Sequence, residues 1–290
     1  MRPHFPQVTI VGTGFIGGSI GLATKSAGLA DVVVGTDVDQ DAINQALAAR
    51  AIDQGHTDLL RAVKGSSLVI LASPVGTFEE IIRSTVHVLE RETILSDVGS
   101  VKGQMVMNID ALLPPHLYFV GAHPIAGSEK SNALSSYSDL FNGKPCVVTP
   151  TSETNATALS VIRSFWESIG TTVTTMDPLL HDKFFGAVSH LPHMIAYATL
   201  NSITRIRDAL FPDANLHTLS PSSLKDMTRI ASSSPSLWSE ICCQNAGNLV
   251  TMLETYQDEI SELTSLVRQG DRHGLQHAFA QAKNLRDQLC

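Results

Sequence analysis

A glycine-rich turn near the N-terminus constrains the fold of this 290-residue chain more than any other feature of its sequence. The apolar run Val8–Val11 predicts a buried strand, and the segment 15–27 predicts a helix. Between them lies the sequence Gly12-Thr-Gly-Phe-Ile-Gly17, which has the spacing G-x-G-x-x-G. Gly12 permits a tight turn, Gly14 lets the backbone approach a ligand, and Gly17 lets the helix pack closely on the strand. The turn therefore predicts a strand–turn–helix unit that binds a pyrophosphate at the helix N-terminus.

An acidic residue follows at the distance that a dinucleotide site requires. Asp37 closes the next predicted strand, about twenty residues beyond the last glycine, where a carboxylate binds ribose hydroxyls. Its charge would repel a 2′-phosphate, so NAD is favoured over NADP as the cofactor. Asp39 is the competing candidate for the ribose role. The predicted cofactor-binding residues are Gly12, Gly14, Phe15, Ile16, Gly17, Asp37, Ser73 and Pro74.

Predicted strands and helices alternate through the first part of the chain. The further strands are Val32–Thr36, Leu68–Ala72, Thr93–Asp97, Tyr118–Ala122, Cys146–Thr149 and Thr171–Thr175, and the further helices are 39–50, 78–89 and 154–169. This order predicts an α/β domain with a doubly wound parallel sheet and helices on both faces. Strand-like runs disappear after Pro178, so we expect a domain over residues 1–178 and a helical domain over 179–290.

Two apolar stripes with helical spacing run through the second domain. The first comprises Leu180, Phe184, Val188, Leu191, Ile195 and Ala198, and the second comprises Trp238, Ile241, Asn245, Leu249, Met252, Tyr256, Ile260 and Leu263. Such stripes are typical of the core of a helix bundle. The second is long for a domain of this size, which leaves a dimer interface as the alternative.

Polar residues cluster where the predicted strands end. Ser73 follows the third strand, Ser100 and Lys102 follow the fourth, and His123 follows the fifth. Ligands of open parallel sheets bind at the carboxyl ends of the strands, so these residues should converge near the nicotinamide. Oxidation of an alcohol by NAD needs a base for the hydroxyl proton, and histidine suits this role. We therefore expect His123 to be the base, with Ser100 orienting the imidazole or sharing the hydroxyl. Lys102 is either a further ligand-binding residue or a solvated lysine at a helix start.

The second domain adds three candidates. His190 and His193 share one face of a helix, with a kink or broken turn expected at Pro192 between them. They have no convincing third partner for a metal ion, so no metal site is predicted. Arg229 suits a carboxylate ligand, and a structural ion pair with Asp226 is the alternative.

Composition excludes several classes of partner. The formal net charge is −8 and no basic patch stands out, so a nucleic-acid partner is not expected. No apolar run approaches the length of a signal peptide or a membrane span, which predicts a cytoplasmic protein without membrane contact. The four cysteines lack metal-ligand spacing and are expected to be thiols.

Taken jointly, the motifs resemble the prephenate dehydrogenase family from about residue 8 to residue 260. The segments that carry the resemblance are Gly12-Thr-Gly-Phe-Ile-Gly17, Asp97-Val-Gly-Ser100-Val-Lys102, His123-Pro-Ile-Ala-Gly-Ser-Glu129, His181-Asp182, Ser189-His190-Leu-Pro-His193 and Asp226-Met-Thr-Arg229-Ile-Ala with Trp238. The resemblance implies a Rossmann domain followed by an all-α dimerisation domain, with the active site between them, and a homodimer formed through the helical domain. It also implies NAD-dependent oxidative decarboxylation of prephenate to 4-hydroxyphenylpyruvate in tyrosine biosynthesis.

The resemblance further implies roles for individual residues. His123 would take the hydroxyl proton with Ser100 beside it, and Arg229 would bind a substrate carboxylate. The substrate-binding candidates are Arg229, His193, His190, Glu129, Trp238 and Lys102. Because the chain ends at Cys290, we expect neither the regulatory ACT domain nor the fused chorismate mutase of some relatives.

Three alternatives stay open from the sequence. The nearest is an arogenate dehydrogenase or a dual-specificity cyclohexadienyl dehydrogenase, because Glu129 could pair with the ammonium group of arogenate. A two-domain hydroxyacid or imine-reducing dehydrogenase would share the first domain but would not need His123, His193 and Arg229 together. A catalytically silent NAD-binding regulator would have a damaged catalytic set.

Overall fold

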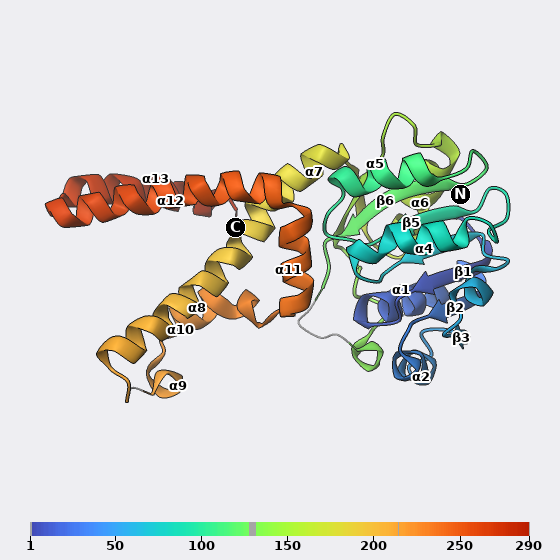
Figure 1. Cartoon of the computed structure of the whole chain (residues 1–290), viewed down its shortest axis with the longest axis horizontal. Helices are drawn as coiled ribbons and strands as arrows, with labels where there is room; N and C mark the ends of the chain where they lie inside the picture. Colours follow the sequence, from blue (N-terminus) through green and yellow to red (C-terminus); the bar gives the residue numbers. More distant parts are fainter. Residues whose placement is uncertain (1, 128–131, 214, 290) are drawn as a thin grey trace. The chain divides into compact units, whose positions relative to one another are not determined.

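The N-terminal part of the computed structural model, which describes residues 2–127, 132–213 and 215–289, is built on one twisted sheet (Figure 1). Among the described residues the sheet has eight strands in the order β3-β2-β1-β4-β5-β6-β7-β8. Their bounds are β1 Phe5–Val11, β2 Ala30–Thr36, β3 Gln54–His56, β4 Leu68–Leu71, β5 Ile94–Asp97, β6 Tyr118–Pro124, β7 Pro145–Thr149 and β8 Thr172–Thr175. The order reverses between β1 and β4, which is the switch point of a doubly wound dinucleotide-binding sheet. The predicted α/β class is confirmed.

Helices cover both faces of the sheet. Their bounds are α1 Phe15–Ser26, α2 Gln40–Ala48, α3 Leu59–Val63, α4 Phe78–Thr85, α5 Gly103–Leu112 and α6 Ala156–Ser168. One core contains Ile20, Ile43 and Trp166 from α1, α2 and α6, and the other contains Phe78 and Ile109 from α4 and α5. Successive side chains of a strand point to opposite faces, so β1 contributes alternately to the two cores.

One pairing departs from the predicted parallel sheet. Strand β7 runs antiparallel to β6, with His123 opposite Val147 and Pro124 opposite Cys146. Among the described residues between these strands there is only a short 3-10 turn, Ala133–Ser135, and a parallel return would need a longer crossover such as a helix. Helix α6 then provides such a crossover, and β8 is parallel to β7. The sequence prediction also missed the short strand β3 and the helices α3 and α5.

The rest of the chain is helical, as predicted. The elements are α7 Pro178–Phe185, a π-helical turn Gly186–His190, α8 Leu191–Leu210, α9 Leu216–Leu219, α10 Ser222–Thr228, a 3-10 turn Arg229–Ser232, α11 Pro235–Gln244, α12 Ala246–Gln269 and α13 Arg272–Gln288. The π-helical turn directly precedes Leu191 and Pro192, so the broken turn expected at this proline is confirmed. The second apolar stripe is not continuous, because α11 ends just before Asn245 and α12 begins just after it.

The chain divides into two compact units, Met1–Asn245 and Ala246–Cys290. The first unit contains the sheet and the helices up to α11, and the second consists of α12 and α13. The predicted boundary near residue 178 marks the change from strands to helices rather than the division into compact units, and it stays a prediction. No helix in the described part of the chain is long and apolar enough to cross a membrane.

Candidate active site

The glycine-rich turn has the geometry that its sequence predicts. Gly12 has a φ of +96°, and a Cβ atom there would lie 2.7 Å from the backbone of Ala72 at the end of β4. A Cβ atom on Gly17 would lie 2.0 Å from the carbonyl oxygen of Gly12. These two positions therefore accept only glycine, and they bring the N-terminus of α1 up to the switch point of the sheet.

The start of α1 presents unpaired backbone donors. Helix α1 begins at Phe15 after Gly14, and its first intrahelical hydrogen bond runs from the N–H of Gly18 to the carbonyl of Gly14. No acidic side chain occupies the first turn. The N–H groups of Phe15 and Ile16 therefore remain available to an anion, which the positive end of the helix dipole also favours. The ring of Phe15 is buried and packs edge-on against Tyr137, so only its backbone faces a ligand at this turn.

The two acidic candidates for the ribose role have different surroundings. Oδ2 of Asp37 accepts a hydrogen bond of 2.9 Å from the backbone N–H of Thr13, inside the glycine-rich turn. Asp39 instead caps α2, where its side chain accepts from the N–H of Asp41 at 2.9 Å. Asp37 is thus held at the edge of the turn, while Asp39 is engaged by its own helix. This arrangement favours Asp37.

Ser73 and Pro74 lie just beyond β4, beside Gly12. The hydroxyl of Ser73 is 2.9 Å from that of Thr77, and the hydroxyl of Thr77 donates to the carbonyl of Pro74. The two predicted cofactor residues therefore belong to a compact turn at the switch point of the sheet.

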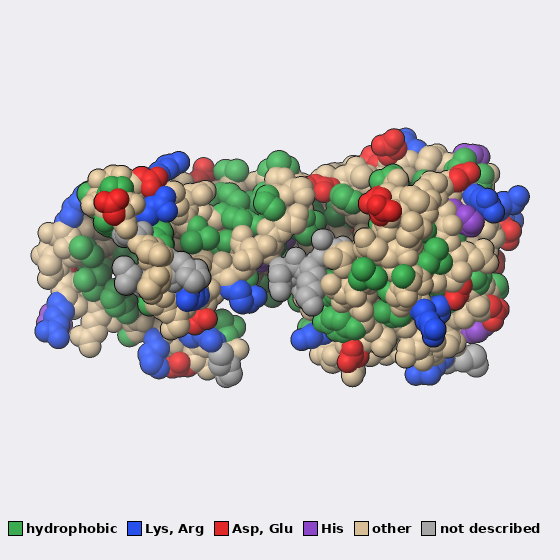
Figure 2. Space-filling model, turned by 90° about the horizontal axis from the view of Figure 1, so that it is seen from below, with side chains coloured by type: hydrophobic (Ala, Val, Ile, Leu, Met, Phe, Trp, Pro, Cys, Tyr) green, Lys and Arg blue, Asp and Glu red, His purple; other side chains and the backbone are tan. Residues whose placement is uncertain are grey.

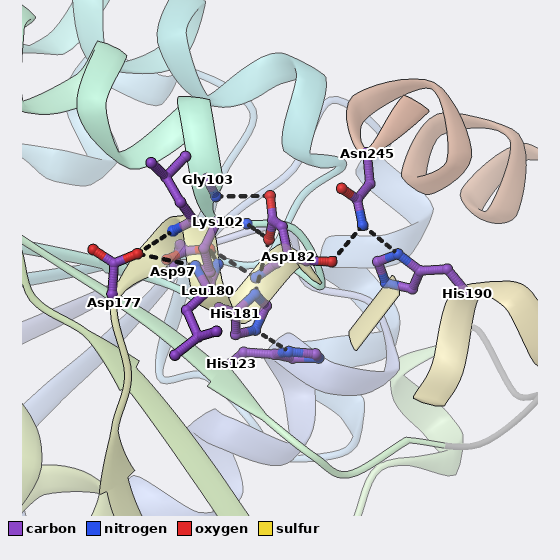
Figure 3. A network of polar contacts seen from close by, with 12 residues as sticks. Asp97, Lys102, Gly103, His123, Asp177, Leu180, His181, Asp182, His190 and Asn245 are labelled. Carbon is purple, nitrogen blue, oxygen red and sulfur yellow. Dashed lines mark hydrogen bonds and ion pairs between the residues drawn. The ribbon is translucent and has the colours of Figure 1, made fainter. Parts of the chain in front are cut away.

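His123 lies at the end of β6, where His181 of α7 joins it to Asp182 of the same helix (Figure 3). Its Nδ1 is 2.9 Å from Nε2 of His181, and Nδ1 of His181 is 2.8 Å from Oδ1 of Asp182. The ring of Phe185 packs against both imidazoles. We refer to Asp182, His181 and His123 as the histidine relay.

The carboxylate end of the histidine relay is fixed by helix α5. Asp182 accepts hydrogen bonds from the backbone N–H groups of Lys102, at 2.7 Å, and Gly103, at 2.8 Å. These are donors at the N-terminus of α5, where a negative charge is stabilised by the helix dipole. A carboxylate can only accept, so His181 donates through Nδ1 and must accept through Nε2. His123 therefore donates through Nδ1, which leaves the lone pair on its Nε2.

Burial keeps the two histidines of the relay neutral. The pKa of His123 is held well below its ordinary value by burial first, and then by the neighbouring His181, Lys102 and His190. Burial also lowers the pKa of His181, although the hydrogen bond to Asp182 opposes this shift. His123 is consequently an unprotonated base at neutral pH, and the residue as a whole is partly exposed.

Lys102 lies in the core of the protein, where its side chain cannot reach a substrate at the surface. Its side chain is 0% exposed, and its ammonium group forms an ion pair with the equally buried carboxylate of Asp97. Burial raises the pKa of Asp97 and lowers that of Lys102, while their mutual attraction opposes both shifts. Asp97 also accepts from the N–H groups of Gly99 and Ala122, so the pair joins the end of β5 to β6. The predicted substrate contact of Lys102 is therefore corrected to a position in the core.

Ser100 lies in the segment that connects β5 to α5. Its side chain is partly exposed, and its hydroxyl makes no hydrogen bond to another described residue. His181, rather than Ser100, contacts Nδ1 of His123, and the role of Ser100 in orienting the imidazole or sharing the hydroxyl stays a prediction. The hydroxyl of Ser100 stays available to a ligand.

The helical segment contributes a second group of predicted residues. His193 stacks on Trp238 with ring centroids 3.4 Å apart, and Trp238 also meets His190 edge-on at 6.0 Å. Burial lowers the pKa of His193, and the positive charge of Arg229 lowers it further. Arg229 is exposed and forms no ion pair with a described carboxylate, so the alternative pairing with Asp226 is not observed. The group therefore combines an aromatic surface with an available cation.

His190 is buried within the same segment. Burial lowers its pKa to about 4. Its Nδ1 is 3.0 Å from the side-chain nitrogen of Asn245, which also donates to the carbonyl oxygen of Asp182 at 2.8 Å. The histidine relay and His190 are thus joined through one amide. Glu129 lies outside the described residues.

The sequence reasoning missed the contributions of His181, Asp182 and Asn245. The pair His181-Asp182 was visible as a motif, but nothing in the sequence indicated its contact with β6. Asn245 had been placed in an apolar stripe, where a single polar residue was the only signal.

Comparison with known proteins decides the family. The nucleotide-binding domain of prephenate dehydrogenase matches residues 20–175, and the dimerization domain of prephenate dehydrogenase matches residues 177–281. The chain belongs to the prephenate dehydrogenase family. Its members include dehydrogenases named for prephenate and for cyclohexadienyl substrates, so the family makes this chain an oxidoreductase.

Individual relatives agree with this assignment. Prephenate dehydrogenase of Bacillus subtilis is 31% identical over 283 residues, which cover 97% of this chain and 76% of the relative. Cyclohexadienyl dehydrogenase of Zymomonas mobilis is 30% identical, with coverage of 97% and 95%. The solved structure of Aquifex aeolicus prephenate dehydrogenase with hydroxyphenyl propionate and NAD+ is 33% identical, with a TM-score of 0.89 and 98% coverage of both chains. The predicted Rossmann domain followed by a helical domain is confirmed.

Proposed function

We propose that this member of the family is an NAD-dependent prephenate dehydrogenase, which converts prephenate to 4-hydroxyphenylpyruvate with loss of carbon dioxide. The observation that carries the proposal is the histidine relay, because it leaves an unprotonated nitrogen on His123 at the carboxyl end of the sheet. A dehydrogenase of an alcohol needs such a base next to its cofactor.

The glycine-rich turn fits the proposed cofactor. The pyrophosphate would be held by the N–H groups at the start of α1, and the ribose hydroxyls by Asp37. NAD, when bound, supplies the acceptor for the hydride that leaves the ring carbon bearing the hydroxyl. The Aquifex aeolicus relative was solved with NAD+, which supports the choice of cofactor.

The histidine relay would handle the proton. His123 takes the hydroxyl proton on Nε2 as the ketone forms, and the resulting imidazolium donates a hydrogen bond through Nδ1 to His181. The hydrogen bond from His181 to the carboxylate of Asp182 stabilises this positive charge. Loss of the ring carboxylate then makes the ring aromatic, and the same oxygen regains a proton as the phenol. The base is thus neutral before and after each turnover, which suits a histidine with a lowered pKa.

The substrate would lie against the helical segment. Prephenate is a dianion, and Arg229 is an exposed cation close enough to His193 to lower its pKa. We assign a carboxylate of the substrate to Arg229, and the face of the substrate to the stacked pair His193 and Trp238. His190 and Glu129 complete the proposed substrate site.

A dual-specificity cyclohexadienyl dehydrogenase is the second candidate. The Zymomonas mobilis relative carries that name and is almost as similar to this chain as the Bacillus subtilis prephenate dehydrogenase. The two substrates differ at the side chain, which carries a ketone in prephenate and an amine in arogenate. Glu129 is the residue that we expect to distinguish them.

We also propose that the enzyme is a homodimer formed through its helical part. The matched dimerization domain supports this proposal. Three members of the first apolar stripe, Leu180, Phe184 and Val188, are about half exposed rather than buried in a bundle core. Figure 2 shows hydrophobic side chains at the surface of the helical part of the chain. A second copy of the chain would cover such residues.

The proposed activity is tested by steady-state assays with prephenate and arogenate, using the wild type and Arg229→Ala. We expect the wild type to turn over prephenate with NAD and to release carbon dioxide in equal amount. Loss of one hydrogen bond to a charged group should raise the KM of Arg229→Ala by about tenfold or more. Lys225→Ala removes another exposed cation of the same region, on α10, and should leave KM unchanged. Wild-type turnover of arogenate alone would overturn the proposed substrate, and an unchanged KM for Arg229→Ala would overturn its role.

Asp37 should set the preference for NAD. In Asp37→Ser the carboxylate that repels a 2′-phosphate is gone, so the ratio of kcat/KM for NAD to that for NADP should fall by about tenfold or more. Asp39→Ser is the matched control, because serine can still cap α2. The ratio is measured with saturating prephenate for both variants. A ratio that falls equally in Asp39→Ser, or in neither variant, would contradict the assignment of Asp37.

A further inference from the structure

Asn245 joins two parts of the proposed site. It follows the last residue of α11, and its side chain is buried. Its amide nitrogen donates to the carbonyl oxygen of Asp182 at 2.8 Å and lies 3.0 Å from Nδ1 of His190 (Figure 3). An amide NH2 group has two hydrogens, and both are directed at these two acceptors.

This contact determines where His190 carries its proton. Because Asn245 presents a donor to Nδ1, that nitrogen must accept and cannot itself be protonated. The ring is neutral near pH 7, since burial lowers the pKa of His190 to about 4. A neutral imidazole has one N–H group, so the proton of His190 is on Nε2.

The N–H group at Nε2 has no partner of normal geometry among the described residues. The atom is buried, and His190 as a whole is only 1% exposed. A backbone contact with Ser100 raises the pKa of His190, yet Nε2 has no hydrogen bond of normal geometry to that backbone. Buried donors in folded proteins are almost always paired, so an orphaned one needs an explanation.

The surroundings of His190 indicate what the missing partner is. The neighbouring side chains that act on its pKa are those of Asp182, His181 and His193, and the ring of Trp238 meets it edge-on. All of them belong to the histidine relay or to the proposed substrate surface. An acceptor for Nε2–H would therefore come from a molecule bound at this site.

We propose that Asn245 is a positioning residue that fixes His190 in the Nε2–H tautomer, so that His190 donates a hydrogen bond to an oxygen of a bound ligand. The tautomer itself follows from contacts within the chain, and only the identity of the ligand rests on the proposed function. The ligand oxygen belongs either to a substrate carboxylate or to the carboxamide of NAD, and these two sources are distinguished by experiment.

The tautomer is tested by NMR of the full-length protein labelled with 15N-histidine, without ligand. His190→Gln identifies the resonances of His190 by their loss. We expect the wild type to be protonated at Nε2 alone near pH 7. Asn245→Asp replaces the donor by an acceptor of equal size, so it should move the proton to Nδ1 and raise the pKa of His190. Asn245→Ala offers neither group and should populate both tautomers. A wild type protonated at Nδ1, or an unchanged proton position in Asn245→Asp, would overturn the proposal.

The ligand is tested by titrating the labelled wild type with NAD alone, and separately with hydroxyphenyl propionate, the ligand of the Aquifex aeolicus structure. A shift of the Nε2–H resonance with one of them identifies the source of the oxygen. If the Nε2–H resonance does not shift with either probe alone or with the two together, the proposed donor role of His190 is overturned. These titrations do not require turnover, so their results remain valid even if prephenate is not the substrate.

Measurements of kcat/KM distinguish a positioning role of Asn245 from a purely structural one. Asn245→Asp should lower kcat/KM by roughly 10–100-fold, the equivalent of one hydrogen bond to a charged group. In a His190→Gln background the same change should have little further effect, because Asn245 acts through His190. Asn201→Asp adds the same charge at an exposed position of α8 and should leave kcat/KM unchanged. Equal losses in both backgrounds would show that Asn245 acts on folding rather than on His190.

Discussion

His123→Asn should lower kcat by about 10²–10⁴-fold, the range expected for the loss of an acid–base group. Asparagine is smaller than histidine but retains a polar side chain, so strand β6 and its pairing with β7 should be preserved. Its amide cannot accept the hydroxyl proton of the substrate at neutral pH. The expected result is a large loss in kcat with a much smaller change in KM, because the hydride and carboxylate contacts are left in place.

The measurement is steady-state turnover of prephenate with NAD, with the unfolding midpoint recorded for each variant. His87→Asn is the matched control, because His87 is exposed in the turn after α4 and is remote from the histidine relay. We expect its kcat to equal that of the wild type. Turnover of His123→Asn within a few-fold of the wild type, with both proteins folded, would show that another group is the base.

The N-terminal fold could be predicted because its signals are local. The glycine-rich turn, the apolar strands and the helices between them each occupy a short stretch of sequence, and parallel strands with helical crossovers have few possible arrangements. The direction of β7 could not be predicted from a local signal. Its apolar run reads the same in either direction, and the direction depends on whether a helix precedes it. The interruption of the second stripe at Asn245 likewise depends on its buried contacts rather than on periodicity.

The candidate site was predictable only in part, for a physical reason. Ser100 and His123 follow strands, and strand ends meet at one edge of a parallel sheet, so their proximity follows from topology. His181 comes 58 residues after His123 and reaches it from a helix, which no local pattern indicates. Lys102 shows the opposite error. A lysine after a strand is usually solvated, and only the structure reveals that Asp97 holds it in the core.

These contacts join a strand of the sheet and a helix of the helical part at one imidazole. The proposed base, His123, belongs to β6, whereas His181 and Asp182, which fix its tautomer, belong to α7. Asp182 accepts hydrogen bonds both from the backbone at the N-terminus of α5 and from Nδ1–H of His181. The position of α7 on α5 thereby determines which nitrogen of His123 is free.

Asp182→Asn should therefore prevent His123 from acting as a base, although Asp182 does not contact His123. The carboxylate accepts three hydrogen bonds, and an amide of the same size has only one oxygen. If the new NH2 group faces His181, that ring must accept through Nδ1 and donate through Nε2. His123 then accepts through Nδ1 and carries its proton on Nε2, which is the wrong tautomer for a base. We expect kcat to fall by about 10²–10⁴-fold.

The pH dependence separates this mechanism from simple damage to the fold. In the wild type, the acidic limb of kcat/KM should lie below pH 6.5, because the base is active when neutral and the pKa of His123 is lowered. Asp182→Asn should stay inactive across the neutral range, since its loss of activity comes from the position of a proton on His123 and not from the charge of the ring.

Asp177→Asn is the matched control. Asp177 accepts two backbone N–H bonds of 2.9 Å at the start of α7, and asparagine caps helices equally well. Asp177→Asn should thus retain the activity and pH profile of the wild type, and an Asp182→Asn enzyme that does the same would rule out the histidine relay.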